Sequence, residues 1–327
     1  MEVVAVKKLY VVSGIMMCLF LTGCAGMAKS KTGKNGNAAT PGDCQMQNEG
    51  DRTADGSGGQ NGSPDGRKGG NDNGSVEDQT EATTEDMTLL RDYDAVSNKK
   101  FSWYIVRDKN HGISDCDHSF SIEQYDAYYV DQDAGDDKVM YLTFDCGYEN
   151  GYTEQMLDSL KKHNAKACFF VTQTYIRDNV ELVKRMKEEG HQVGNHTVTH
   201  PSMPGISVEK QKEELQTCAD YMKEATGYRM DPYFRPPSGE YSERVLQLAK
   251  DMGYKTIFWS MAYLDYDVNN QPGKDYVIEH FDKYYHNGAI PLIHNVSESN
   301  AQALDTVLSN LTELGYRFVS LDEMFEK

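Results

Sequence analysis

The feature that most constrains the fold is a repeated alternation of strand-like and helical segments from Phe101 to the C-terminus. Six runs have the character of strands: 139–144, 167–171, 192–194, 256–259, 289–293 and 317–320. Six longer stretches between them have helical character: 154–163, 179–189, 208–225, 242–251, 275–285 and 301–314. Repeated strand–helix units predict a parallel α/β fold, whose ligand sites lie at the carboxyl ends of the strands.

Residues typical of helix ends support these boundaries. Ser242 and Ser299 stand where an N-cap is expected, because a serine side chain can accept a hydrogen bond from the first turn. Glycine follows four of the helical stretches, where a left-handed residue commonly ends a helix: Gly190, Gly227, Gly253 and Gly315. We therefore expect well-defined helices between the strands.

The first 24 residues have the order of a secretory signal. Lys7 and Lys8 precede an apolar stretch over residues 9–21, which is short for a membrane span. The segment ends in Leu-Thr-Gly-Cys, which resembles a bacterial lipobox whose Cys24 is lipidated and becomes the first mature residue. This interpretation predicts an extracytoplasmic lipoprotein; an ordinary signal peptide or an uncleaved anchor is the alternative.

A polar linker follows the signal. Residues 25–90 are rich in Gly, Asn, Ser and Asp and contain very few large apolar side chains. Between residues 41 and 90 there are 3 basic and 11 acidic residues, a net charge of 3 − 11 = −8. Such a segment cannot offset its chain entropy by burial, so we expect a disordered tether with a span of ~45 Å. The folded domain should then comprise residues 91–327.

The charge of the chain excludes some partners. The 327 residues carry a formal net charge of −18, which argues against binding to nucleic acid because the phosphates would not be neutralised. The same charge argues against adhesion to an anionic membrane surface. At 39% apolar and 26% charged residues, the composition suits one globular domain beside a non-globular part.

Residues able to carry chemistry follow successive predicted strands. They are Asp145 in TFDCG, His196 and His200 in HTVTH, Arg235 in FRPPSG, Asp265 after the strand at 256–259, and His294 after the strand at 289–293. Alone, each has an ordinary explanation, such as a turn-forming Asp or a surface Arg. Together they predict one site at one edge of the sheet, because the carboxyl ends of parallel strands meet there.

The order and content of these segments resemble the polysaccharide deacetylase family with the NodB-homology domain. The blocks TFDCG, HTVTH, RPPSG, YLDY and LIH match the five blocks of that family in order. Longer matches, including SWYIVRDKNH and HNVSESNAQAL, are similar to the delta-lactam-biosynthetic de-N-acetylases of spore cortex peptidoglycan. The resemblance implies a distorted (β/α) barrel of about seven strands, and it implies metal-dependent de-N-acetylation of glycan.

The resemblance also implies roles for individual residues. Asp145 would be the general base that activates water, and Arg235 would hold its carboxylate. His294 would be the general acid that protonates the leaving amine, and Asp265 would tune His294. Amide hydrolysis needs this division of work, because a water must lose a proton and an amine must gain one.

By the same resemblance, His196 and His200 would bind a divalent metal, with zinc as the first candidate. The chain departs from the family pattern at Cys146, where the second Asp of the first block is expected. A thiolate there would favour zinc, so Cys146 is a further candidate ligand, unless its side chain points away. Tyr266 replaces the Trp of the fourth block, and this change should alter only the wall of the acetyl pocket.

Three functions remain open from the sequence. The leading hypothesis is deacetylation of N-acetylmuramic residues of peptidoglycan on the route to muramic delta-lactam. A second keeps the reaction but takes N-acetylglucosamine glycans, either peptidoglycan or chitooligosaccharide. A third, motivated by Cys146, is an inactive glycan-binding lipoprotein; the presence of Asp145, Arg235 and His294 argues against it.

Overall fold

The computed structural model describes residues 91–116 and 119–326. The predicted signal sequence, the lipobox with Cys24 and the linker over residues 25–90 lie outside the described residues. Within the part of the chain that is described, no helix has both the length and the apolar character needed to cross a bilayer.

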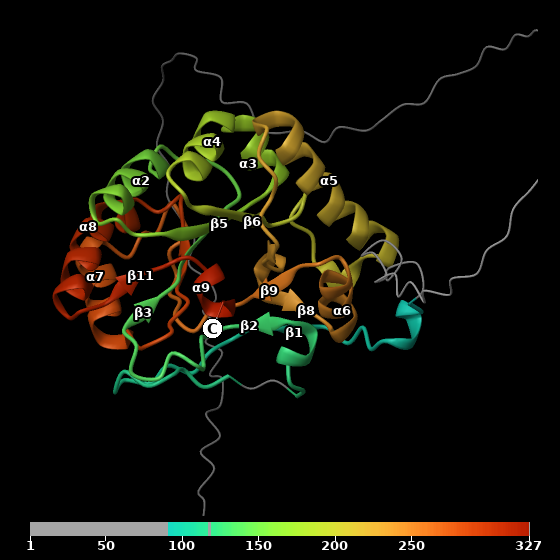
Figure 1. Cartoon of the computed structure of the whole chain (residues 1–327), viewed down its shortest axis with the longest axis horizontal. Coiled ribbons are helices and arrows are strands. Elements are labelled where there is room, and N and C mark those ends of the chain that lie inside the picture. Colours follow the sequence, from blue (N-terminus) through green and yellow to red (C-terminus); the bar gives the residue numbers. More distant parts are fainter. Residues whose placement is uncertain (1–90, 117–118, 327) are drawn as a thin grey trace, which may run out of the picture. The chain divides into compact units, whose positions relative to one another are not determined.

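A seven-stranded parallel sheet forms the centre of the domain (Figure 1). Its strands, in spatial order, are β10 (Leu292–His294), β4 (Leu142–Cys146), β5 (Ala167–Val171), β6 (Gln192–Asn195), β7 (Tyr233–Phe234), β9 (Lys255–Ile257) and β2 (Ala127–Tyr128). Asp145 pairs in register with His294 on one side and with Phe170 on the other. The register therefore brings two of the predicted site residues together at the carboxyl ends of β4 and β10.

The sheet curls towards a barrel, and single bridges connect its two edges. Val130, just after β2, bridges Ala289, and Met261, after β9, bridges Pro291 just before β10. These contacts bring the two ends of the strand order together without a continuous ladder between β2 and β10. The predicted distorted barrel of about seven strands is confirmed.

Helices cover the outside of the curled sheet (Figure 1). The six predicted helices correspond to α2 (Thr153–Lys162), α4 (Val180–Glu188), α5 (Val208–Thr226), α6 (Glu243–Asp251), α7 (Lys274–Tyr284) and α8 (Glu298–Glu313). Two short helices were not predicted, α3 (Gln173–Asp178) and α9 (Asp322–Phe325). They are too short for a helical period to show in the sequence.

One predicted cap is right and one is wrong. Ser242 caps α6, since its side chain accepts from the backbone N–H of Val245. The cap of α8 is Ser297 instead of Ser299, because the Ser297 hydroxyl accepts from the N–H of Asn300. The four predicted end glycines all have a positive φ, as a left-handed helix end requires.

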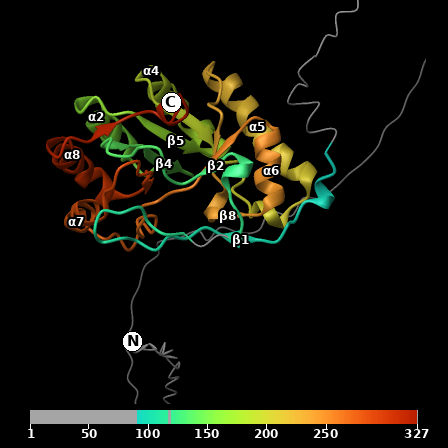
Figure 2. The same ribbon diagram turned by 60° about the horizontal axis from the view of Figure 1, so that its bottom comes forward.

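Several strands are only two residues long and were missed or merged in the sequence. The predicted strand at 139–144 is two strands, β3 (Val139–Met140) and β4, which part at Tyr141. β3 pairs in parallel with β11 (Arg317–Phe318). β1 (Phe101–Ser102) pairs antiparallel with β8 (Glu240–Tyr241), and Figure 2 shows the N-terminal segment passing along this side of the sheet. A strand of two residues is too short to show the alternation of apolar and polar residues by which a strand is recognised in a sequence.

The main hydrophobic core lies between the sheet and the helices. Alternate residues of β4 and β5 face outwards, and the rings of Phe144 and Phe169 stack there with centroids 4.9 Å apart. Fully buried leucines from the helices pack in the same cluster, including Leu157 and Leu308. The residues between them, Asp145 among them, face the interior of the barrel instead.

Gly194 provides a test of the packing inside the barrel. A Cβ at this position in β6 would lie 2.8 Å from the Phe170 ring and 2.9 Å from the carbonyl oxygen of Tyr233. We expect Gly194→Ala to lower the free energy of unfolding by about 1–3 kcal/mol, because the backbone oxygen cannot move aside freely. Urea denaturation measures the change. Gly147→Ala is the control, since a Cβ there meets nothing within 4 Å; equal losses in the two variants would contradict the packing argument.

Candidate active site

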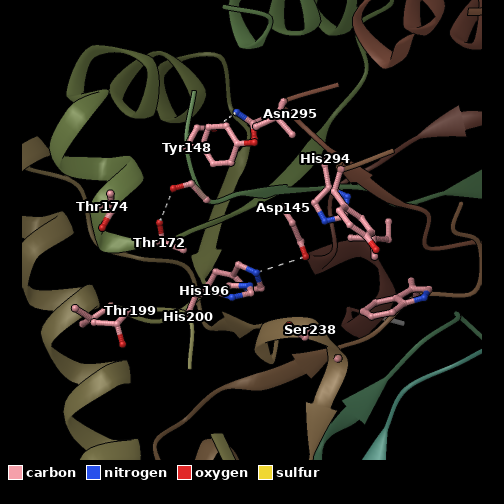
Figure 3. A pocket seen from close by; sticks show the side chains of 17 residues that line it. Asp145, Tyr148, Thr172, Thr174, His196, Thr199, His200, Ser238, His294 and Asn295 are labelled. Carbon is pink, nitrogen blue, oxygen red and sulfur yellow. Dashed lines mark hydrogen bonds and ion pairs between the residues drawn. The ribbon is translucent and has the colours of Figure 1, made fainter. Parts of the chain in front are cut away.

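A cavity of about 890 Å³ opens at the carboxyl ends of β4, β6 and β10. Figure 3 shows Asp145, His196, His200 and His294 converging on this cavity from three segments of the chain. Its wall also contains aromatic and apolar side chains, among them Trp259, Tyr266, Leu292 and Val296. Polar groups that converge within an apolar wall are the usual composition of a ligand site.

Asp145 is fixed by a buried ion pair with Arg235. The Nη1 of Arg235 donates to Oδ1 of Asp145 over 2.8 Å, and the Arg235 side chain has no exposed surface. Two further donors of the guanidinium bind backbone carbonyl oxygens, Nε to Ile257 (2.9 Å) and Nη2 to Phe258 (3.0 Å). Because β9 ends at Ile257, the strand itself orients the arginine, and the arginine orients the acid.

The same contacts keep Asp145 ionised. Burial alone would raise its pKa, but the positive charge of Arg235 and the hydrogen bond that the guanidinium donates lower the pKa below its usual value. Oδ1 is bound to Arg235, whereas Oδ2 lies 3.6 Å from Nε2 of His196 at the cavity. Asp145 therefore presents a carboxylate oxygen that can accept a proton at neutral pH.

His196 is held in a state suited to binding a metal. Its Nδ1 lies 2.8 Å from the carbonyl oxygen of Arg235, and a carbonyl only accepts, so Nδ1 carries the proton. Burial lowers the pKa of His196 to about 4, which keeps the imidazole neutral. The Nε2 lone pair is then free for a metal ion, and a backbone acceptor behind the ring is the usual support for such a ligand.

His200 lies beside His196 at the rim of the cavity. The two rings are 4.8 Å apart between centroids, and His200 is exposed. The segment joining them is a tight loop that belongs to no helix or strand. Within residues 91–116 and 119–326, no group of three or more His, Cys, Asp or Glu side chains is arranged to hold a metal ion by itself, so a metal here would need other ligands as well. Two neutral imidazoles with Asp145 nearby fit an open metal site that leaves positions for water and substrate.

Cys146 does not belong to this group, which corrects its prediction as a candidate metal ligand. Adjacent residues of a strand face opposite sides, so the thiol of Cys146 lies in the outer core while Asp145 faces the cavity. The side chain is fully buried, and burial raises the pKa of its thiol well above the ordinary value. A thiol on the outer face of β4 is directed away from a metal held by His196 and His200, which line the cavity.

Asp265 and His294 form a second acid–imidazole pair. Oδ1 of Asp265 lies 2.7 Å from Nδ1 of His294, and Oδ2 accepts from the backbone N–H of His294 over 2.8 Å. Burial alone would lower the pKa of His294, but Asp265, with help from Asp145, raises it. His294 therefore holds a proton more readily than a free histidine does, and its ring lines the cavity.

Two residues that support this pair were not identified from the sequence. Nδ2 of Asn300 donates to Oδ2 of Asp265 (2.7 Å) and to the carbonyl oxygen of His294 (3.2 Å). The hydroxyl of Tyr263 donates in turn to Oδ1 of Asn300 over 2.7 Å. Asn300 lies in the HNVSESNAQAL segment that carried the family resemblance, so a signal was present, although nothing in it indicated this role.

A further polar network joins the loops after β4 and β10. The amide nitrogen of Asn295 donates to the carbonyl oxygen of Tyr148 and to Oε2 of Glu149, at 3.0 and 3.1 Å. Oε1 of Glu149 accepts backbone N–H groups at the start of α2, including that of Tyr152. Burial would raise the pKa of Glu149, but these hydrogen bonds, those from Thr153 above all, lower it. The loops that follow the strands of Asp145 and His294 are thus tied to each other.

Comparison with known sequences places these residues in a family context. Residues 132–257 match the sequence profile of the family described as polysaccharide deacetylase. The chain is 44% identical over 237 residues to the peptidoglycan-N-acetylmuramic acid deacetylase PdaA of Bacillus subtilis. This alignment covers 72% of the present chain and 89% of the relative. It is 35% identical over 192 residues to a peptidoglycan-N-acetylglucosamine deacetylase of Bacillus cereus, covering 58% of this chain and 88% of the relative.

Solved structures agree with these sequence matches. The structure of PdaA from Bacillus subtilis, a family 4 carbohydrate esterase, aligns with a TM-score of 0.67 at 42% identity, over 70% of this chain and 98% of that chain. A family 4 carbohydrate esterase from Bacillus anthracis aligns with a TM-score of 0.58 at 38% identity, over 71% and 99%. A pseudoenzyme of the same family from Bacillus anthracis aligns with a TM-score of 0.54 at 31% identity, over 58% and 66%.

The Asp265–His294 pair predicts how His294 titrates. Because the negative charge of Asp265 raises the pKa of His294, we expect Asp265→Asn to lower the midpoint of its titration, as followed by NMR of the imidazole Cε1–H. In the unaltered protein the raised pKa adds stability below the ordinary value of 6.5, and that stability is lost as the pH rises through the folded pKa. Asp267→Asn is the control, since Asp267 is exposed in the same loop. An unchanged midpoint in Asp265→Asn would contradict the assignment.

Proposed function

Because this chain belongs to the polysaccharide deacetylase family, we propose that it removes the acetyl group from N-acetylmuramic acid residues of peptidoglycan, by hydrolysis of a linear amide. The observation that carries the proposal is the similarity to an N-acetylmuramic acid deacetylase over nearly the entire length of that relative. The free amine formed on a muramic residue can then condense with its lactyl carboxyl group, forming the C–N bond of a muramic delta-lactam and releasing the carboxyl oxygen as water.

The metal of this reaction would be held by His196 and His200, with zinc as the expected ion. Support comes from the fixed Nδ1–H of His196, which leaves Nε2 unprotonated at the cavity, and from the neighbouring ring of His200. When bound, a divalent metal polarises the acetyl carbonyl and lowers the pKa of a water molecule towards ~7. Cys146 has no part in this proposal, because its thiol lies in the core.

Asp145 would act as the general base. Its Oδ1 is engaged by Arg235, so the orientation of the carboxylate is set before substrate arrives. Its Oδ2 faces the cavity and can take the proton of the attacking water. The low pKa of Asp145 keeps this oxygen unprotonated across the neutral range.

His294 would act as the general acid. An amine is a poor leaving group unless its nitrogen first gains a proton. His294 lines the cavity, and because its pKa is raised it can hold and donate that proton. Asp265 orients the ring through Nδ1, which leaves Nε2 to donate the proton towards the substrate. The base and the acid thus differ in protonation because their neighbours differ in charge.

Membership of the family does not itself establish catalysis, since one structural relative is described as a pseudoenzyme. In this chain, support for catalysis comes from contacts that glycan binding alone does not need. Arg235 is completely buried to hold one carboxylate, and Asp265 is buried to hold one imidazole. Buried charges of this kind are retained when they have partners and a task.

We also propose that the protein acts outside the cytoplasm, attached to the membrane by lipid on Cys24 and separated from it by the linker over residues 25–90. Support comes from the lipobox sequence and from the polar composition of the linker. More than one acyl chain would give stable attachment, whereas a single chain gives only marginal binding.

Release of acetate tests the reaction and its substrate. We expect zinc-dependent release of acetate from peptidoglycan freed of its muramic side-chain peptides, and little release from chitooligosaccharide. Mass spectrometry of the glycan would show whether the muramic product is the free amine or the lactam. Asp145→Asn should lower the rate by roughly 10²–10⁴-fold, because the amide cannot accept the proton. Asp267→Asn, an exposed neighbour of Asp265, is the matched control. Release chiefly from chitooligosaccharide would overturn the substrate, and glycan binding without release would overturn the enzyme.

Lipid attachment has its own test. Cells that express the protein are labelled with radioactive palmitate, and the label is followed after separation of membranes from the soluble fraction. We expect the wild type to be labelled and to sediment with membranes, whereas Cys24→Ala is unlabelled, because only the thiol can accept the diacylglyceryl group. Cys18→Ala, within the predicted signal, is the control and should behave as wild type. Labelling that persists in Cys24→Ala would contradict the lipobox.

A further inference from the structure

The loop over residues 196–200 has an unusual backbone. Thr197 has φ 71° and His200 has φ 58°, both in the left-handed region. A β-branched residue rarely adopts this conformation, because its side chain crowds the backbone. The loop belongs to no helix or strand, so side chains from elsewhere must hold it in shape.

Glu214 makes the contacts that hold the middle of the loop. Its Oε2 accepts the backbone N–H groups of both Val198 and Thr199, each over 2.8 Å, and its Oε1 accepts from the hydroxyl of Thr199 over 2.7 Å. These three bonds all go to Val198 and Thr199, two of the three residues that lie between the candidate ligands. Charge-assisted bonds to backbone N–H groups are stronger than neutral ones.

The other backbone N–H groups of the loop bind acceptors within the loop and in strands β5 and β6. The N–H of Thr197 donates to Oδ1 of Asn195 over 2.9 Å, and the N–H of His200 donates to Oγ1 of Thr197 over 3.0 Å. The N–H of His196 donates to the carbonyl oxygen of Val171 in β5. Each of the five backbone N–H groups from 196 to 200 therefore has an acceptor. For two of them, those of Val198 and Thr199, the acceptor is the carboxylate of Glu214.

Glu214 stands on a rigid element. It lies in the interior of α5, whose first turn is capped by Ser207 and whose buried face includes Leu215. Nδ2 of Asn195 donates to the carbonyl oxygen of Leu215 over 2.8 Å, which joins α5 directly to the strand that precedes the loop. The position of the carboxylate relative to the loop is thus fixed by the fold.

We propose that Glu214 is a positioning residue for the metal: it holds the backbone between His196 and His200 so that both imidazoles face the same point. The inference rests on the metal site of the proposed function. Glu214 does not touch the cavity, and it acts through the peptide groups of Val198 and Thr199. Without it, two N–H groups lose their acceptors, and the left-handed residues on either side are free to relax.

The test compares Glu214→Ala, Glu214→Asp and Glu214→Gln with the control Glu213→Ala. Glu213 is the adjacent, exposed residue of α5 and forms an ion pair with Lys210. Each protein is titrated with Zn²⁺ against a chelating dye, and its Co²⁺ form is examined by visible absorption. Exchange of the Val198 and Thr199 amide hydrogens is measured on the metal-free protein, and the melting temperature is recorded for each variant.

We expect Glu214→Ala to bind Zn²⁺ about tenfold more weakly, the lower limit for loss of a group that supports metal ligands. Its Co²⁺ spectrum should change, and both amides should exchange faster. Glu214→Asp should show the same changes to a lesser degree, and it decides the question if Glu214→Ala does not fold. Glu214→Gln should bind nearly as the wild type does, because its carbonyl oxygen can still accept both N–H groups.

Three results would overturn the inference. Glu214→Ala could bind Zn²⁺ as tightly as Glu213→Ala does, or its two amides could remain as protected as in the wild type. Glu214→Gln could be as weak as Glu214→Ala, which would assign the effect to charge and not to hydrogen bonding. In each case the wild type still binds the metal, so the proposed function stands. If the wild type binds neither Zn²⁺ nor Co²⁺, the metal of the proposed function fails, and this inference fails with it.

Discussion

The buried ion pair between Arg235 and Asp145 is the interaction on which the rest of the site depends. Arg235 is fully buried, and it joins β7, which precedes it, to β4 through Asp145 and to β9 through two carbonyl oxygens. Its guanidinium also lies over the ring of Phe170, 4.3 Å from the centroid. A pair buried this deeply contributes little net stability, but loss of one partner leaves an uncompensated charge and costs about 3–5 kcal/mol. The sheet is therefore built around a buried positive charge whose partner is the carboxylate of Asp145.

The imidazoles beside that pair are held in two different protonation states. The two imidazoles nearest Asp145 differ in state: burial keeps His196 neutral, whereas Asp265 favours the protonated form of His294. A neutral imidazole can bind a metal, and a protonated imidazole can act as an acid. The carboxylate of Asp145 therefore lies beside two imidazoles that suit different roles. The difference arises because a carboxylate lies behind His294 and raises its pKa, whereas only a backbone carbonyl lies behind His196, where burial prevails.

Much of this could be predicted from the sequence, and the exceptions have physical causes. The long helices and β5 were predicted closely because each contains enough residues for its period to show. The two-residue strands were not, since pairing across the sheet creates them and local preference does not. Asp145, His196 and His294 were found because they follow strands, but the sequence could not show which face of β4 Cys146 occupies. Asn300 binds the Asp265 carboxylate and Glu214 binds backbone N–H groups of another segment, and no local sequence pattern records such contacts.

The incomplete closure of the barrel has a consequence for the behaviour of the protein in crowded surroundings. An open sheet offers unpaired N–H and C=O groups along its edge strands, and these can pair with the edge of another molecule. Here β2 is two residues long, β10 is three, and the bridges at Val130–Ala289 and Met261–Pro291 occupy backbone beside them. Neither edge is long enough to template a further strand. The domain thus resists edge-to-edge aggregation without a fully hydrogen-bonded barrel, and the carboxyl ends of its strands remain open to a polymeric substrate.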